Sequence, residues 1–448
     1  MGIMEVDMKY VIIGASAAGA QAAEELRKVD NQAQITVISS EAHLPYSRCL
    51  ISRFVDGRLK EDNLYFKTKR FFEQYNIDGV LGTRVIKIDK EAKKVISEYG
   101  KEYAYDRLLI ATGSSPWSPK IDGLDLKGIY SFHSLNNACD ILQKMDEIGR
   151  AVIIGAGFVG LEAAYALARQ GKKVTVVEKA SQILPNQMDA IGSQIIQKDL
   201  EELGVEIILS QSIVSIDGND SVQGVTVADK TRIPCEILVI ATGMRPNIGL
   251  AVDAGIKTDR GIIVNEFLRT SEPDIYAAGD VIEIEDISTG RRIPSATWFN
   301  AVLQGKFAGR NMAGLETRYS QGIGIQNAVQ FHQIPAISFG KTQINEEDEQ
   351  DYDVMSIHKD KVYKKLVLKD GRICGMIFVG DIAKSGFYTA LIRHGVDVSE
   401  YRSKLLDSDF SYAYFKEENF GQYNPYSESN AVWEQPNWWA NRVQYIEG

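Results

Sequence analysis

Two stretches of the chain share one pattern of apolar and polar positions. A short run of β-branched residues leads into a turn of small residues and then into an alanine-rich segment. The first copy covers Tyr10–Arg27 (YVIIGASAAGAQAAEELR) and the second covers Ala151–Gln170 (AVIIGAGFVGLEAAYALARQ). The pattern predicts a strand, a tight turn and a helix in each copy. A second apolar strand follows each copy, at Gln34–Ser39 and Lys173–Glu178. We therefore predict two βαβ units of the kind that binds dinucleotides.

A second repeated phrase follows each unit. Leu108–Pro116 reads LLIATGSSP and Leu238–Pro246 reads LVIATGMRP, so each predicts a buried strand that ends at Thr-Gly before a proline-containing loop. Ser271–Asp280 (SEPDIYAAGD) predicts a further strand that ends at Gly-Asp, and a helix is expected over Ala296–Gly314. Along the chain, each βαβ unit is thus followed by its own ATG strand, and the strand that ends at Gly-Asp comes after the second ATG strand.

The character of the chain changes beyond about residue 320. Val362–Leu368, Lys369–Gly371 and Arg372–Val379 predict a strand, a turn and a strand, and Phe387–Gly395 predicts a helix stopped by glycine. The last forty or so residues are rich in aromatic side chains without clear periodicity. We interpret them as an extended arm that serves self-association or partner docking.

The turn of the first unit reads Gly14-Ala-Ser-Ala-Ala-Gly19 and departs from GxGxxG at one position. Gly14 permits the tight turn, and Gly19 permits close packing of helix and strand. Ser16 replaces the middle glycine and stays small enough for a pyrophosphate to approach. The anion would then lie at the helix N-terminus, where free N–H groups and the helix dipole favour it. A single turn of this kind is a weak signal, but the second unit repeats it.

The turn of the second unit is a full GxGxxG, made by Gly155, Gly157 and Gly160. Glu178 ends the next strand, where a carboxylate can accept hydrogen bonds from a ribose 2′-hydroxyl. A carboxylate would repel the 2′-phosphate of NADPH, for which an arginine is expected instead. Lys179 follows Glu178, but no arginine does. The sequence therefore favours NADH over NADPH.

Composition excludes several classes of protein. The chain has 448 residues, a net charge of −10 and a pI near 5.3, so a nucleic-acid partner is not expected. No apolar run is long enough to cross a bilayer, and the N-terminus lacks the apolar region of a signal peptide, so we expect a cytoplasmic protein without membrane insertion. The four cysteines, at positions 49, 139, 235 and 374, lie far apart and show no metal-ligand spacing. We therefore expect no metal site, and no iron–sulfur cluster held by this chain alone.

Taken together, the motifs from about Lys9 to Gly314, and more loosely to about residue 400, resemble the FAD-dependent pyridine nucleotide–disulfide oxidoreductase superfamily. The resemblance implies that the first unit binds FAD and the second binds NAD(P)H. Asp280 would contact the flavin ribityl chain, Val85 would lie by the adenine, and Glu162 would lie near the nicotinamide and the flavin. The implied FAD contacts are Gly14, Ser16, Ala17, Ala18, Gly19, Ser40, Glu41, Arg48, Val85, Ala111, Thr112, Gly113, Gly279 and Asp280. The implied NAD contacts are Gly155, Gly157, Phe158, Val159, Gly160, Glu178 and Gly243.

Within the superfamily that the chain resembles, three classes of enzyme differ in their redox cysteines. The CxxxxC pair of dithiol reductases is missing, because only Cys49 lies in that region. Cys49 does occupy the place of the single redox cysteine of coenzyme A-disulfide reductases and NADH oxidases. However, Leu44–Arg53 (LPYSRCLISR) and Tyr363–Ser399 look more like reductases that serve iron–sulfur proteins. We therefore favour a flavoprotein that exchanges electrons between NADH and an iron–sulfur protein, possibly as one subunit of a larger redox complex.

Two alternatives stay open. One is an NADH-dependent coenzyme A-disulfide, persulfide or oxygen reductase that uses Cys49. Arg48 and Arg53 could stabilise a Cys49 thiolate, although a cysteine is more often an inert small apolar residue. The other alternative is a non-catalytic, flavin-binding scaffold or sensor. The family pattern also suggests that Arg53 forms an ion pair with Glu162 near the flavin, which makes Glu162, Arg53 and Cys49 the candidate catalytic residues.

The expected fold is α/β, with two Rossmann-like domains of the three-layer ββα type and a C-terminal α+β domain. The predicted FAD-binding domain is discontinuous, over residues 1–117 and 248–320. The predicted NAD-binding domain covers residues 118–247, and an interface domain with the aromatic arm covers residues 321–448. An iron–sulfur protein and a second copy of the chain, or a larger complex, are the expected partners.

Overall fold

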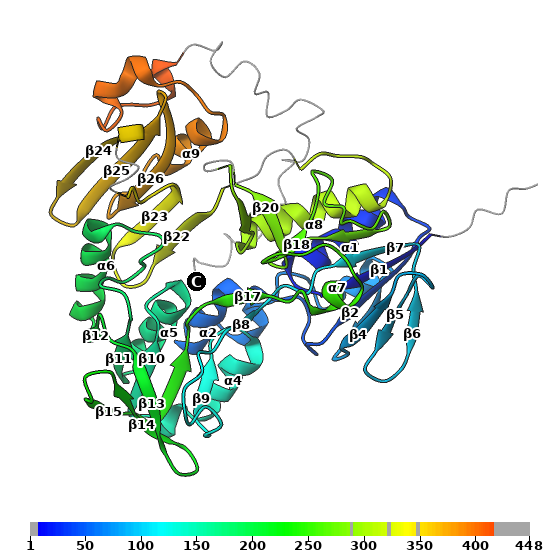
Figure 1. The fold of residues 1–448 in the computed structure, drawn as a ribbon, viewed down its shortest axis with the longest axis horizontal. Helices are drawn as coiled ribbons and strands as arrows, with labels where there is room; N and C mark the ends of the chain where they lie inside the picture. The colour runs from blue at the N-terminus through cyan, green and yellow to red at the C-terminus, as the bar shows by residue number, and fades with distance from the viewer. Residues whose placement is uncertain (1–7, 287–289, 320–323, 346–349, 416–448) are drawn as a thin grey trace, which may run out of the picture.

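The computed structural model describes residues 8–286, 290–319, 324–345 and 350–415. The predicted aromatic arm beyond residue 415 lies outside the described residues. The described chain is an α/β protein with two parallel sheets and a separate antiparallel sheet near the C-terminus (Figure 1). The predicted α/β class is confirmed.

The first sheet is parallel and has the order β19-β7-β1-β2-β3. Its strands are β1 (Lys9–Ile13), β2 (Gln34–Ser39), β3 (Asp78–Leu81), β7 (Arg107–Ile110) and β19 (Ile275–Ala277). Helix α1 (Ala17–Val29) connects β1 to β2 as predicted. β19 comes from far along the chain and pairs with β7 in parallel, so the two segments share one sheet.

The second sheet repeats this arrangement, with the order β12-β11-β10-β16-β9. Its strands are β9 (Ile129–Ser131), β10 (Arg150–Ile154), β11 (Lys173–Val177), β12 (Glu206–Ile208) and β16 (Ile237–Ile240). The helices beside it are α4 (Leu135–Gln143), α5 (Phe158–Arg169) and α6 (Ala190–Glu202). β10 and β16 correspond to β1 and β7 of the first sheet, so the sequence repeat is a repeat of structure.

Each unit also carries a small antiparallel sheet, in keeping with the expected ββα layering. These sheets consist of β4 (Val85–Asp89), β5 (Lys94–Ser97) and β6 (Glu102–Ala104), and of β13 (Ile213–Gly218), β14 (Val222–Val227) and β15 (Arg232–Pro234). The segments after the two ATG strands, β8 (Ser114–Pro116) and β17 (Met244–Pro246), pair in antiparallel fashion. This crossing ribbon joins the two units. Further elements of the two units are α2 (Ile51–Val55), α3 (Phe71–Gln74), α7 (Gly249–Asp253), β18 (Ile262–Ile263), β20 (Ile282–Glu285) and β21 (Arg292–Pro294).

The C-terminal sheet is antiparallel, with the order β22-β23-β26-β25-β24. Its strands are β22 (Gln326–Gln330), β23 (Pro335–Gly340), β24 (Asp353–Lys359), β25 (Val362–Lys369) and β26 (Arg372–Val379). The predicted strand, turn and strand from residue 362 are confirmed. Helix α9 (Ser385–Arg393) begins two residues before the predicted start and is followed by Gly395 with φ +55°.

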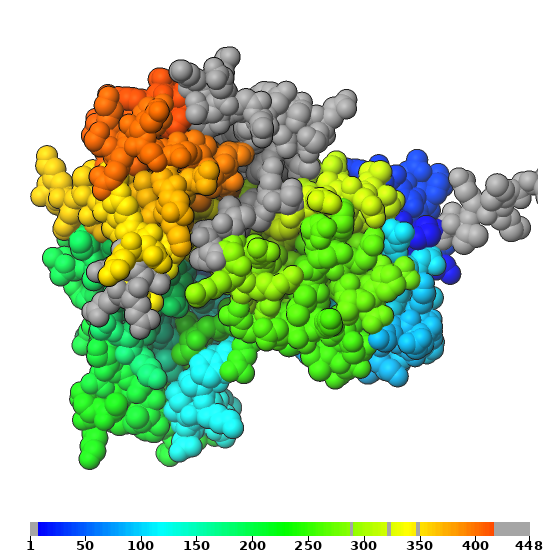
Figure 2. Space-filling model, turned by 45° about the horizontal axis from the view of Figure 1, so that its top comes forward, coloured from blue at the N-terminus to red at the C-terminus, as the bar shows by residue number. Residues whose placement is uncertain are grey.

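A buried ion pair fastens the C-terminal sheet to the second unit. One Asp189 carboxylate oxygen caps helix α6 by accepting from Gly192 N–H at 3.1 Å. The other oxygen accepts from the Tyr363 hydroxyl at 2.6 Å and from Lys365 Nζ at 3.0 Å. Lys365 is only 8% exposed, and its ammonium group is paired with this carboxylate and also donates to the Thr342 carbonyl oxygen at 3.0 Å. Figure 2 shows the yellow-to-orange C-terminal part directly above the green part that contains α6.

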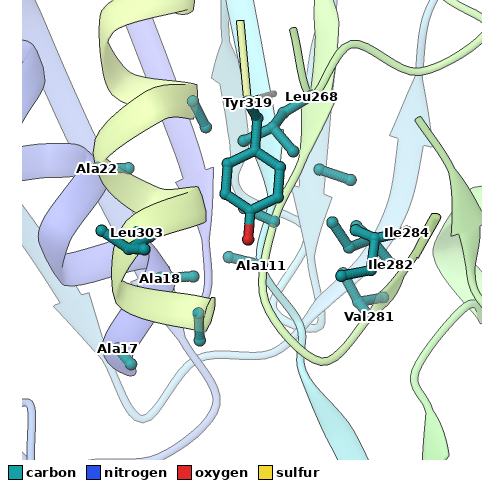
Figure 3. Packing of buried hydrophobic residues seen from close by; sticks show 14 of the residues in the cluster. Ala17, Ala18, Ala22, Ala111, Leu268, Val281, Ile282, Ile284, Leu303 and Tyr319 are labelled. Atoms are coloured by element: carbon teal, nitrogen blue, oxygen red, sulfur yellow. The ribbon is translucent and has the colours of Figure 1, made fainter. Parts of the chain in front are cut away.

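Close packing of α1 and α8 (Trp298–Met312) holds the first unit together. A β-carbon on Gly305 would lie 2.2 Å from the Ala18 carbonyl oxygen, and one on Gly309 would lie 2.7 Å from that of Ala22. Figure 3 shows Ala17, Ala18 and Ala22 of α1 beside α8. The two helices approach so closely because glycine and alanine lie at these points of closest contact.

Gly305→Ala should therefore destabilise the protein, because the new methyl group would push α8 away from the α1 backbone. We expect a loss of about 1–3 kcal/mol in the free energy of unfolding, measured by denaturant titration. Gly386→Ala is the matched control, because Gly386 lies in α9 and a β-carbon there meets no atom within 4 Å. Equal stabilities of the two variants would contradict the packing argument.

Candidate nucleotide-binding and redox site

The turn before α1 needs both of its glycines. Gly14 has φ +114°, and a β-carbon there would lie 2.1 Å from the Ala111 carbonyl oxygen. A β-carbon on Gly19 would lie 1.8 Å from the Gly14 carbonyl oxygen. Ser16 is the N-cap of α1, and its side chain makes no capping hydrogen bond. The N–H groups of the first turn, beside Ala17 and Ala18, can therefore receive an anion.

The turn before α5 has the same geometry. Gly155 has φ +99°, and a β-carbon there would lie 2.5 Å from the Ala241 carbonyl oxygen. A β-carbon on Gly160 would lie 1.9 Å from the Gly155 carbonyl oxygen. Gly157 is the N-cap of α5, and no atom lies within 4 Å of its β-carbon position. The open space above Gly157, next to Phe158 and Val159, fits the approach of a pyrophosphate.

Glu178 lies beside this second turn. Its carboxylate accepts hydrogen bonds from Ala156 N–H at 2.7 Å and from Ala180 N–H at 2.8 Å. These two bonds fix the carboxylate at the end of β11, half-buried, while Lys179 is exposed. A ribose hydroxyl that approaches the glycine turn would meet an oriented acceptor here.

The two ATG strands end in turns that are held by the crossing ribbon. The Thr112 hydroxyl donates to the Asn247 carbonyl oxygen at 3.0 Å, and Asn247 Nδ2 donates to the Thr112 carbonyl oxygen at 2.8 Å. In the second unit, Trp117 N–H donates to the Gly243 carbonyl oxygen at 2.9 Å. Gly113 and Gly243 have φ +66° and +124° with open space around their β-carbon positions. Backbone at both positions is therefore accessible to a ligand.

Asp280 follows β19 at the point where α1 and α8 meet. A β-carbon on Gly279 would lie 3.1 Å from the Ala18 β-carbon, so Asp280 is close to the start of α1. The Ser114 hydroxyl donates to Asp280 Oδ2 at 3.0 Å. Burial raises the pKa of Asp280, while the Ser114 hydrogen bond and the charge of Arg48 oppose the shift. Asp280, the predicted contact of the ribityl chain, thus lies near the starts of both α1 and α8.

The segment after β2 forms a charged cluster. Glu41 accepts from the Tyr46 hydroxyl at 2.7 Å and from Arg48 at 2.6 Å, and Arg48 also donates to the His133 carbonyl oxygen at 2.8 Å. Burial tends to raise the pKa of Glu41, but Arg48 and the hydrogen bonds hold it below its usual value. Protein donors therefore already engage the carboxylate of Glu41, one of the predicted FAD contacts.

The predicted adenine end lies next to this cluster. Gly82 N–H donates to the Glu41 carbonyl oxygen at 3.1 Å, and Thr83 N–H donates to the Ser39 carbonyl oxygen at 2.8 Å. Val85 is buried at the start of β4, and Ser40 is exposed. These contacts bring the predicted residues Ser40, Glu41 and Val85 to one end of the first sheet.

Glu162 lies on α5 and faces α2. Burial raises the pKa of Glu162, while a hydrogen bond with Ser52 and the charges of Arg58 and Arg53 act in the opposite direction. In the described part of the chain, no ion pair joins Arg53 to Glu162, so the pair suggested by the family pattern is not formed. Ser52 is buried and turns toward α5, whereas Arg53, the next residue, lies on the exposed side of the short helix.

Cys49 lies in a 3-10 turn (Arg48–Leu50), close enough to Asp280 and Glu162 for the charges of both to act on its thiol. Its side chain reaches the surface, yet desolvation and the charges of those two carboxylates raise the pKa of the thiol to about 11. These causes argue against the possibility that Arg48 and Arg53 stabilise a thiolate, and they agree with the alternative of an inert cysteine. Arg48 turns to Glu41 instead, and the protein groups around Cys49 favour the protonated thiol.

The structure thus gathers Cys49, Glu162 and Asp280, which come from three distant parts of the sequence. It also adds residues that the sequence analysis did not single out: Tyr46, Ser52, Ser114, His133 and Asn247. Their roles depend on contacts with distant segments, for which the local sequence carries no signal. Tyr46 and Ser52 at least belong to the phrase from Leu44 to Arg53 that was noted for its family resemblance.

Across the described ranges, no cluster of three or more His, Cys, Asp or Glu side chains could hold a metal ion. No helix in those ranges combines the length and the apolar character that a bilayer crossing requires.

Two protein-family models match the chain. The model described as pyridine nucleotide-disulphide oxidoreductase matches residues 8–305, which is more than half of the chain. The model described as rubredoxin NAD+ reductase C-terminal domain matches residues 327–396. The second matched region begins where the C-terminal sheet begins, at β22.

Curated relatives carry several names. The chain is 32% identical to nitrite reductase [NAD(P)H] of Bacillus subtilis (strain 168) over 88% of this chain and 48% of that protein. The chain therefore spans about half the length of this relative. It is 38% identical to NADH oxidase of Methanocaldococcus jannaschii over 70% of this chain and 71% of that protein.

Solved structures show the same fold. An NAD-dependent persulfide reductase from A. fulgidus matches with a TM-score of 0.84 and 30% identity, over 90% of this chain and 80% of that chain. NADH:rubredoxin oxidoreductase from Clostridium acetobutylicum matches with a TM-score of 0.71 and 26% identity, over 86% and 95% of the two chains. One family is indicated by the glycine turns, by the ATG strands and by the family-model match. The chain belongs to the pyridine nucleotide-disulphide oxidoreductase family, and its expected cofactors are FAD and NADH.

Proposed function

We propose that this protein exchanges electrons between NADH and an iron–sulfur protein, as an enzyme by itself or as the flavin subunit of a larger redox complex. The observation that carries the choice of acceptor is the similarity of residues 327–396 to the C-terminal domain of rubredoxin reductase. FAD suits this role, because a flavin accepts a hydride and can release electrons singly. The similarity to an NADH:rubredoxin oxidoreductase structure supports the same acceptor class.

The proposal assigns a task to each part of the chain. Residues 1–117 and 248–320 form the FAD-binding domain, with Asp280 at the ribityl chain. Residues 118–247 form the NAD-binding domain, with Glu178 at the ribose of NADH and Glu162 where the two cofactors meet. Residues 321–448 form the interface domain. Holding both nucleotides in one fixed geometry supplies the orientation that hydride transfer needs.

A thiol-based reductase is the second candidate. Its support is the exposed Cys49 close to Glu162 and Asp280, together with the 30% identity to an NAD-dependent persulfide reductase. The raised pKa of Cys49 argues against it, because the nucleophile in such chemistry is a thiolate. The scaffold alternative has no support from the site, and bleaching of the bound flavin by NADH would exclude it.

The choice of acceptor can be tested with the full chain carrying FAD. NADH should bleach the flavin, and oxidised rubredoxin or ferredoxin should restore its colour in stopped-flow measurements. Cys49→Ser should keep this reoxidation rate within about twofold, since the thiol takes no part. Cys374→Ser, in the C-terminal sheet, is the matched control. Loss of reoxidation in Cys49→Ser alone, with coenzyme A-disulfide or persulfide reduction by the native protein, would establish the thiol route instead.

The protonation of Cys49 gives a prediction for pH dependence. With a pKa of about 11, only about one thiol in ten thousand is ionised at pH 7, so alkylation by iodoacetamide should be slow. The rate should rise about tenfold per pH unit from pH 7 to 9, as followed by mass spectrometry of the Cys49 peptide. An ordinary cysteine would level off above its pKa near 8.5. A plateau below pH 8 would show a stabilised thiolate and contradict the prediction.

The assignment of Glu178 predicts a change of nucleotide preference. Glu178→Gln keeps the size of the side chain but removes the charge that repels a 2′-phosphate. The ratio of kcat/KM for NADH to that for NADPH should fall by at least about tenfold. Lys179→Gln, at the neighbouring exposed position, is the charge-removal control and should alter the ratio less. An unchanged ratio in Glu178→Gln would remove this residue from the ribose site.

A further inference from the structure

The loop between β11 and α6 covers residues 178–189 and begins at Glu178, the predicted ribose contact. This β11–α6 loop lies against the glycine turn of the second unit. Leu184 N–H donates to the Ala156 carbonyl oxygen at 2.9 Å, and Ala156 N–H donates to the Glu178 carboxylate at 2.7 Å. Both backbone groups of Ala156, inside the glycine turn, are therefore bonded to the loop, so a shift of the loop would also disturb the turn.

Leu184 adopts a backbone conformation that depends on its surroundings. Its φ of +47° lies in the left-handed region, which a non-glycine residue occupies only where the rest of the structure holds it. Its carbonyl oxygen accepts from the N–H groups of Gln187 and Met188, both at 3.0 Å. The side chains of Leu184 and Met188 are fully buried in an apolar cluster that also contains Tyr363 and Ile377 of the C-terminal sheet. The loop is thus part of the seam between the second unit and that sheet.

Gln343 binds the same loop from the C-terminal side. It follows β23 by three residues, and its Nε2 group donates to the Met188 carbonyl oxygen at 2.9 Å and to the Pro185 carbonyl oxygen. The ion pair of Asp189 with Lys365 holds the last residue of the loop. The C-terminal part of the chain therefore holds one end of the loop, and the glycine turn holds its middle.

We propose that the C-terminal sheet sets the affinity for NADH, because Gln343 and the Asp189–Lys365 pair hold the β11–α6 loop in the conformation that binds the nucleotide. Gln343 is a positioning residue, since it acts through the loop on Glu178 and on the glycine turn. A loop that is ordered before binding loses less conformational freedom on binding, which raises affinity. The inference rests on the proposed NADH site at Glu178 and is independent of the electron acceptor.

The position of the loop predicts which step should change. The loop bears on the predicted ribose and pyrophosphate contacts, Glu178 and the glycine turn. Glu162, the candidate residue beside the nicotinamide, lies on α5 and bonds to Ser52 of α2. Loosening the loop should therefore weaken binding of the adenosine half of NADH, while hydride transfer within the bound complex stays nearly unchanged.

Gln343→Met in the full, FAD-bound chain tests this role, because methionine has a similar length and no N–H donor. The dissociation constant for ADP-ribose, which lacks the nicotinamide, should rise at least about fivefold in calorimetry, as expected for a lost hydrogen bond. The limiting rate of flavin bleaching at saturating NADH should stay within about twofold in stopped-flow measurements. Gln333→Met is the matched control. Gln333 is an exposed glutamine between β22 and β23, and its backbone N–H donates to Asp199 of α6 at 3.0 Å.

Flavin content and the thermal unfolding midpoint report whether each variant folds. Tyr363→Phe, which removes the hydroxyl bound to Asp189, is a second variant and should also weaken ADP-ribose binding. Unchanged affinity in Gln343→Met, or an equal loss in Gln333→Met, would overturn the inference and leave the NADH site in place. A limiting rate that falls as much as the affinity would overturn it as well. A native protein that binds no ADP-ribose would refute the NADH site itself, and with it this inference.

Discussion

The contact between a helix start and the strand before it is the constraint on which this structure depends. At Gly19 and at Gly160, the helix lies so close to a carbonyl oxygen of its own turn that no β-carbon fits. This contact fixes the first N–H groups of each helix at the carboxyl end of a parallel sheet. Because both units contain this contact, the chain forms two candidate nucleotide sites with the same geometry.

Much of the fold could be predicted because the signals were local and repeated. The two units, the helix from Trp298 and the hairpin of β25 and β26 each have strong periodicity or a glycine at a turn. The short strands of the small antiparallel sheets were not located individually, because three-residue elements such as β6 and β15 are too short to show a period. Their existence followed only from the family resemblance.

The sequence predicted which residues form the candidate site, but not which hydrogen bonds and ion pairs join them. Cys49, Glu162 and Asp280 do gather, as the family pattern implies. The partners of the arginines were misjudged, because charge alone does not decide which carboxylate a guanidinium contacts. Arg48 contacts Glu41, whose second oxygen is fixed by Tyr46, and Arg53 stays on the exposed side of α2. Such choices depend on distances between segments that are far apart in sequence.

The link between Asp189 and Lys365 has a consequence for how the molecule can move. Separating the C-terminal sheet from α6 would break the bonds of the Asp189 carboxylate to Lys365 and Tyr363, while the carboxylate would stay at the N-cap of its own helix. That seam is therefore stiff. The same sheet also shares a buried apolar cluster with the first unit, through residues such as Phe339 and Leu366, so it packs against both nucleotide-binding units.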